Sequence, residues 1–129
     1  MKTWIPACFA LILITSCAQK KGDTVVGTWK LVQNQIDIGN GKPQFVAVNA
    51  TQTITFYPDG SLSNTSAMCS GVVERATAYS GTYKTSKKQI LPDDCAKQTI
   101  PIYYDVRRDT LVIRYACVET CTSLYVKVP

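Results

Sequence analysis

Cysteine is the residue type in this sequence with the most chemistry to offer, because thiols form disulfides, bind metals and act as nucleophiles. The chain has six cysteines and no histidine. Without histidine, the commonest general base and the commonest metal ligand are both missing. Cys117-x-x-x-Cys121 does not have the Cys-x-x-Cys spacing of redox centres. These residues therefore predict disulfides, with no metal and no cofactor.

The other reactive side chains form no recognisable catalytic group. The sequence contains no Walker loop, dinucleotide fingerprint, nucleophile elbow or zinc motif. Asp93 and Asp94 are neighbouring carboxylates, but adjacent residues in a loop face water more often than they face a substrate. The sequence therefore predicts that the protein is not an enzyme.

Residues 1–16 have the composition of an export signal. Met1-Lys2-Thr3 is a short basic start, and residues 4–14 form an apolar run broken only by Pro6. The run is too short to span a bilayer, which needs ~20 residues, and it fits the core of a signal peptide. We expect residues 1–16 to be removed, together with Cys8.

The residues that follow are Ile14-Thr15-Ser16-Cys17. They resemble the lipobox of bacterial lipoproteins, in which an aliphatic and two small residues precede the modified cysteine. The resemblance implies cleavage before Cys17 and acylation of that cysteine with chains such as palmitate, and two or more chains give a stable membrane anchor. Position 18 is alanine rather than aspartate, which by similarity to known sorting rules favours the outer membrane, facing the periplasm. The alternative is an ordinary secretory signal with an incidental cysteine.

From Val25 onward the pattern favours β-structure. Val, Ile, Thr and Tyr dominate, and no stretch has a sustained helical period. Ile54 and Phe56 alternate with more polar neighbours, as in an antiparallel sheet with one buried and one solvated face. We expect a tether at 17–24 and one domain at 25–129. The expected strands are 25–33, 51–57, 61–68, 79–85, 88–92, 99–106, 110–117 and 121–128.

These strands, joined by short turns, predict an all-β fold: an eight-stranded antiparallel meander that closes into a barrel, because closure removes exposed strand edges. The turn Pro58-Asp59-Gly60 is a strong signal between two of the strands. Residues 34–50 are expected to be a partly apolar loop over the barrel's mouth.

The strand that opens the domain contains Gly27-Thr28-Trp29. A Gly-x-Trp at this place resembles the lipocalin signature, and the chain is most similar to small lipocalin-like lipoproteins of Bacteroidetes-type bacteria. Those share a phenylalanine strand running into a DG turn (56–60 here), an SGTYK-type strand (80–84) and a cysteine-containing end. The resemblance implies a lipocalin-like barrel whose closed end is crossed by Trp29. Lys127 stands where lipocalins usually place an arginine.

The four cysteines of the domain are predicted to gather at one rim of the barrel. Counting the strands up and down places the connections 34–50, 69–78, 93–98 and 118–120 at one end, and by the lipocalin resemblance that end is the open mouth. An even number of cysteines in an oxidising envelope implies disulfides. Three pairings are open, and we favour Cys69–Cys95 with Cys117–Cys121.

Two functions compete. The first is binding of a small apolar ligand in the barrel mouth, with a candidate lining of Ile54, Phe56, Leu62, Asn64, Tyr83, Ile102, Tyr104, Ile113 and Tyr115. The same side chains could equally form a solid core. The second is a lipoprotein that binds another protein, as an envelope assembly factor or enzyme inhibitor, with a filled barrel. A net charge of +5 gives no case for nucleic acid, and we expect a monomer anchored to the membrane by lipid.

Overall fold

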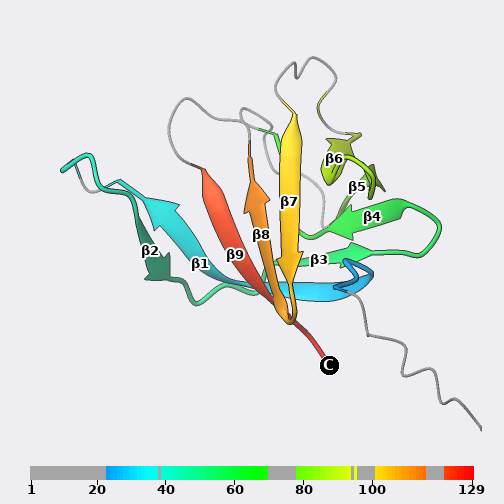
Figure 1. Cartoon of the computed structure of the whole chain (residues 1–129), viewed down its shortest axis with the longest axis horizontal. Helices are drawn as coiled ribbons and strands as arrows, with labels where there is room; N and C mark the ends of the chain where they lie inside the picture. Colours follow the sequence, from blue (N-terminus) through cyan, green and yellow to red (C-terminus); the bar gives the residue numbers. More distant parts are fainter. Residues whose placement is uncertain (1–22, 38, 70–77, 94, 96–100, 116–120) are drawn as a thin grey trace, which may run out of the picture.

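The computed structural model describes residues 23–37, 39–69, 78–93, 95, 101–115 and 121–129. Within these ranges every helix-or-strand element is a β-strand (Figure 1). The strands are β1 Gly27–Ile36, β2 Gln44–Ala47, β3 Thr53–Phe56, β4 Ser61–Asn64, β5 Tyr79–Lys84, β6 Gln89–Pro92, β7 Ile102–Arg107, β8 Thr110–Arg114 and β9 Thr122–Lys127. Among the described residues, no helix is long and apolar enough to cross a membrane.

β1 and β3 to β9 form a closed antiparallel barrel of eight strands. From β3 to β9 each strand pairs with the next along the chain, and β9 returns to pair with β1 from Trp29↔Lys127 to Asn34↔Ser123. The predicted eight-stranded antiparallel meander barrel is therefore confirmed. Closure gives each barrel strand neighbours on both sides, so the barrel itself has no open edge.

Several strands are shorter than predicted. The strand expected at 61–68 ends at Asn64, and the one expected at 110–117 ends at Arg114. The strand expected from residue 99 begins at Ile102, directly after Pro101, because proline has no N–H to contribute to a ladder. Positions 99, 100, 116 and 117 lie outside the described residues.

The predicted loop over residues 34–50 is wrong, because this segment contains the end of β1 and all of β2. β1 continues to Ile36, and β2 pairs back onto it from Gln33↔Ala47 to Ile36↔Gln44. Residues 33–37 and 39–47, called the arm below, belong to a hairpin that extends from the barrel (Figure 1). Among the described strands, β2 is the last of the sheet and pairs with β1 alone.

β2 and β3 follow the same edge of β1, separated by an irregular stretch. Val48 donates its N–H to the carbonyl of Val32 at 2.9 Å, and Leu31 donates to the carbonyl of Gln52 at 3.0 Å. The first contact continues the register of β2 on β1, and the second continues the register of β3 on β1. Because the two registers differ, the pairing with β1 shifts in the stretch between β2 and β3. The arm is thus continuous with the barrel wall and emerges from its mouth end.

The core lies inside the barrel and follows the alternation of the strands. β5 and β7 alternate buried residues with exposed or partly exposed ones along their length, as strands with one solvated face do. Gly81 of β5 faces inward where a Cβ atom would lie 2.8 Å from the Leu91 carbonyl oxygen. Only glycine allows β5 and β6 to approach this closely at that point.

The turn between β3 and β4 forms as predicted. Tyr57 donates its N–H to the carbonyl of Ser61 at 2.9 Å, and Gly60 adopts a positive φ of 89°. Asp59 accepts hydrogen bonds from the Ser61 hydroxyl at 2.6 Å and from its N–H at 2.9 Å. These bonds, led by the hydroxyl, hold the pKa of Asp59 below its ordinary value.

Candidate functional site

The predicted ligand-lining residues all belong to the barrel interior, but they fill it. Eight of them are buried: Ile54, Phe56, Leu62, Asn64, Tyr83, Ile102, Tyr104 and Ile113, and Tyr115 packs against the same cluster while only partly buried. The ring of Phe56 lies 5.1 Å from that of Tyr83 and 5.6 Å from that of Tyr104. Aromatic rings at these spacings are in packing contact, so these side chains serve as core.

The glycine and the tryptophan of the Gly-x-Trp signature stabilise the closed end of the barrel. Trp29 is 0% exposed, and its Nε1–H donates to the carbonyl of Val25 at 2.7 Å. The ammonium of Lys127 lies 5.0 Å from the centre of the Trp29 ring and donates to the carbonyl of Val26 at 2.9 Å. This is a cation–π contact, so Lys127 caps the tryptophan despite lacking a planar group. Gly27 leaves space for the lysine, since a Cβ there would lie 2.9 Å from Lys127 Cε.

A half-open groove of about 610 Å³ lies at this closed end. It runs between residues 23–26 and the turn that follows β5, and Tyr104 and Val106 contribute to its wall. The hydroxyl of Tyr104 is buried with no hydrogen-bond partner, and burial raises its pKa. This groove lies at the end of the barrel opposite the mouth, whereas the sequence predicts a ligand at the mouth.

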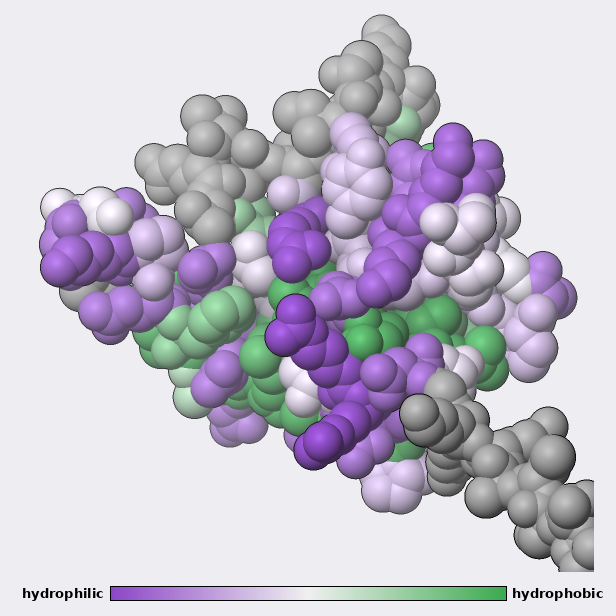
Figure 2. Space-filling view, in the orientation of Figure 1, coloured by the Kyte–Doolittle hydropathy of each residue, from purple (hydrophilic) through white to green (hydrophobic). Residues whose placement is uncertain are grey.

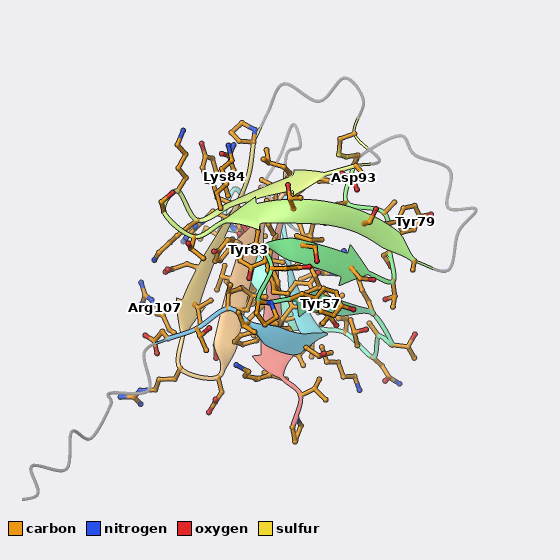
Figure 3. All side chains as sticks on the ribbon, turned by 90° about the vertical axis from the view of Figure 1, so that its right-hand side faces the viewer. Tyr57, Tyr79, Tyr83, Lys84, Asp93 and Arg107 are labelled. Carbon is orange, nitrogen blue, oxygen red and sulfur yellow. A yellow bond between two sulfur atoms is a disulfide. The ribbon has the colours of Figure 1, made fainter. Side chains whose placement is uncertain are left out.

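Both charged residues that line the groove, Asp23 and Lys88, have hydrogen-bond partners. Lys88 contacts the carboxylate of Asp105, and that hydrogen bond is the main cause of the lowered pKa of Asp105. Asp23 accepts a hydrogen bond from the N–H of Arg108 at 3.0 Å. Figure 3 shows Lys84 and Arg107 at this end of the barrel and Tyr79 and Asp93 at the other.

A layer of polar side chains lies toward the mouth. Gln52 Nε2 donates to the Tyr125 hydroxyl at 3.1 Å, and the hydroxyls of Tyr125 and Tyr115 are 2.5 Å apart. Burial raises the pKa of Tyr125 to about 12 and raises that of Tyr115 well above its ordinary value. Asn64 and Tyr79 face each other across β4 and β5, and the amide nitrogen of Asn64 and the hydroxyl of Tyr79 have no hydrogen-bond partner.

The raised tyrosine pKa values predict loss of stability in alkali. A tyrosine whose pKa is raised by folding stabilises the fold fully below the unfolded value near 10, and this contribution is lost as pH rises toward about 12. In urea titrations, the free energy of unfolding should therefore fall between pH 9 and 11 more steeply for the native chain than for Tyr125→Phe. Tyr103→Phe, at an exposed tyrosine of β7, should match the native slope, and equal slopes for all three proteins would contradict the assignment.

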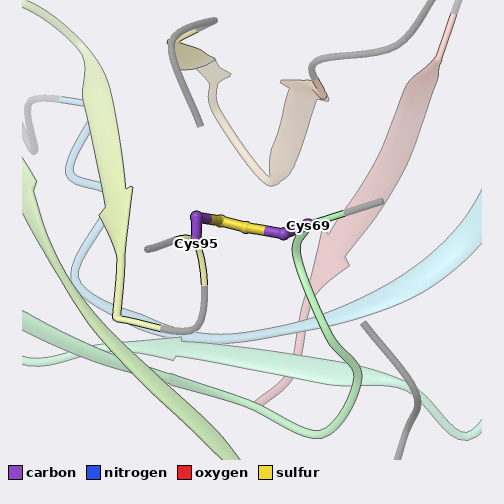
Figure 4. The surroundings of a disulfide bond; sticks show 2 residues. All are labelled: Cys69 and Cys95. Atoms are coloured by element: carbon purple, nitrogen blue, oxygen red, sulfur yellow. A yellow bond between two sulfur atoms is a disulfide. The ribbon is translucent and has the colours of Figure 1, made fainter. Parts of the chain in front are cut away.

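The disulfide Cys69–Cys95 forms as expected, with Cα atoms 5.6 Å apart (Figure 4). Cys69 follows β4 and Cys95 follows β6, two strands that run in the same direction, so the bridge joins two connections at the mouth. Cys121 is also disulfide-bonded, and Cys117, its expected partner, lies outside the described residues. Cys17 lies outside them as well.

The arm is the surface feature that the sequence did not predict. Ile36, Phe45 and Val46 are 42%, 42% and 41% exposed, and all four residues of β2 are exposed. Figure 2 shows hydrophobic surface over β2, below the hydrophilic tip of the arm. The signal available in the sequence was the apolar run after Pro43, but that run was assigned to a lid.

The part of the chain that the structure describes contains neither a metal-binding group of residues nor a pair of carboxylates placed for catalysis. No group of three or more His, Cys, Asp or Glu residues that could hold a metal ion occurs there. Asp93 accepts a hydrogen bond from the Ser80 hydroxyl at 2.7 Å, and Asp94 lies outside the described residues. No protein-family model, curated protein or solved structure matches this chain.

Proposed function

We propose that the protein is a lipid-anchored lipoprotein of the bacterial envelope that binds another protein chain through its arm. The observation that carries the proposal is a hairpin with exposed apolar side chains, attached to a barrel whose interior is filled by its own residues. Exposed hydrophobic surface of this kind marks interaction sites, and a filled barrel leaves its outer surface to do the binding.

The arrangement of the two ends supports this proposal. Residues 23–26 are fixed to the closed end by Trp29, Lys127 and Arg108, while the arm leaves the mouth end. The residues between Cys17 and Asp23 reach roughly 20 Å when extended. An anchor on Cys17 therefore holds the closed end near the bilayer and leaves the arm, at the other end of the barrel, accessible to partners in the periplasm.

Site-specific photo-crosslinking in the native host tests the proposal. A photoreactive phenylalanine analogue replaces Phe45 on the arm, and the matched control replaces Tyr103, an aromatic residue with 43% exposure on the barrel wall. The expected result is a protein adduct from position 45 and none from position 103. Absence of an adduct from position 45, or equal adducts from both positions, would contradict binding through the arm.

A second candidate function is binding of a small, largely apolar molecule at the mouth. It is favoured by the unpaired amide nitrogen of Asn64 and the unpaired hydroxyl of Tyr79, which are buried next to each other in register. Buried polar groups normally have partners, and a bound molecule or an ordered water would supply one. Asn64→Leu would then weaken binding of that molecule without affecting partner capture by the arm.

A further inference from the structure

The free edge of β2 presents backbone groups in a defined pattern. Val48 donates its N–H to the carbonyl of Val32, so these two residues form a hydrogen-bonded pair. Hydrogen-bonded and non-hydrogen-bonded pairs alternate along an antiparallel ladder, so every second residue of β2 before Val48 also bonds to β1. Gln44 and Val46 therefore direct their backbone groups toward β1. Phe45 and Ala47, two positions apart, direct theirs toward the opposite edge, where no other described strand pairs with β2.

We propose that the occupant of this edge is a second copy of the chain, paired β2 to β2 about a two-fold axis. This inference rests on the proposed function and names the protein that the arm binds. In the two-fold register, Phe45 lies opposite Ala47 of the second copy, Ala47 opposite its Phe45, and Val46 opposite its Val46. Both outward-facing residues of each copy then form hydrogen-bonded pairs, which gives four hydrogen bonds across the axis.

The side chains fit this register on both faces of the combined sheet. On one face, the large Phe45 lies beside the small Ala47 of the other copy, and each is flanked by a glutamine of its own β1, Gln35 or Gln33. On the opposite face the two Val46 side chains meet, and Asn34 flanks each of them. Cross-strand apolar pairs of this kind contribute about 0.2–1 kcal/mol each.

Charge also favours a second copy. β2 and the paired residues of β1 carry no charged side chain, so the pairing buries no ion. Lys42 at the tip falls opposite Ala50 of the other copy in this register, so the pairing brings no two lysines together. A proline precedes the strand at position 43, but no proline or charge blocks its edge, and those are the devices that keep natural edge strands apart.

The test is sedimentation velocity on a chain that begins at residue 17 and carries Cys17→Ser, which contains every described strand. The native arm should sediment as one chain at low concentration and as two chains at high concentration. The series runs from about 5 µM to about 500 µM, because small interfaces bind weakly. A single-chain species throughout would overturn the proposal.

Charge-pair variants at the axis make the test specific. Val46 meets itself in the two-fold register, so Val46→Lys alone and Val46→Glu alone should each remain single chains at the highest concentration. An equimolar mixture of the two should regain the two-chain species. Val126→Lys, at a valine of β9 with 37% exposure, is the matched control and should dimerise like the native chain. Dimers of Val46→Lys alone, or no recovery in the mixture, would overturn the register.

A backbone variant checks that pairing uses the edge. Ala47→Pro removes an N–H that points away from β1, so the arm keeps its own hydrogen bonds while the dimer loses two. Ala47→Ser keeps the N–H and should dimerise.

If the native chain stays single while position 45 still yields crosslinks to a different protein in the host, the second copy is excluded and the proposed function stands. If position 45 yields no crosslinks at all, the proposed function itself fails.

Discussion

Replacing Trp29 by alanine is expected to lower the free energy of unfolding by about 3–5 kcal/mol, the usual loss for a fully buried large aromatic residue. The cost arises from several contacts at once. The ring is 0% exposed, its Nε1–H satisfies the carbonyl of Val25, and its face supports the ammonium of Lys127. Removal therefore opens a cavity and releases the segment that leads to the tether.

Urea unfolding followed by far-ultraviolet circular dichroism measures this loss. Tryptophan fluorescence is unsuitable, because the substitution removes the tryptophan that would report unfolding. Trp29→Phe is the matched variant: it keeps an aromatic ring but loses the hydrogen bond to Val25, and a smaller loss of about 1–3 kcal/mol is expected. A loss under about 1 kcal/mol for Trp29→Ala would show that the closed end does not depend on the tryptophan.

Removal of the Cys69–Cys95 bridge by a double serine substitution is expected to cost about 3.5 kcal/mol of stability, because the bridge closes a long loop in the unfolded chain. The two cysteines are 26 residues apart. The double substitution Cys117→Ser with Cys121→Ser removes a much shorter loop in the expected pairing, so a loss of only about 2 kcal/mol is predicted. Urea unfolding under non-reducing conditions measures both.

The order of the two losses is the informative result. A larger loss for the second variant than for the first would contradict the loop-length argument. Equal losses from the four single substitutions at these positions, with scrambled bridges in a peptide map, would contradict the pairing itself.

The sequence predicted the barrel because its strands have one face in the core and one in solvent. Ile54, Phe56, Ile102, Tyr104 and Ile113 were assigned to the interior from alternation alone, and all are buried. Lys127 was expected at the place where lipocalins usually have an arginine, and its ammonium lies over the ring of Trp29. The turn at Gly60 followed from local turn chemistry.

The arm could not be predicted in the same way, because neither of its faces is buried. The residues of β2 are exposed on both faces, so no alternation distinguishes them from a loop. Gln33, Asn34 and Gln35 also interrupt the apolar pattern of β1 and suggest that the strand ends there. The groove at the closed end was missed for a different reason. It forms where residues 23–26 lie against residues distant in sequence, and the pattern of neighbouring residues does not predict such a contact.

Because the barrel is filled by its own side chains, we propose that the protein acts through its outer surface. Native mass spectrometry of the mature domain, with Cys17→Ser and purified from the periplasm of its own host, tests whether the barrel holds a ligand. The predicted result is the bare mass of the chain, or of two chains, with the cysteines oxidised to disulfides. A small molecule that co-purifies in fixed proportion and is lost on denaturation would contradict the claim and identify the ligand class.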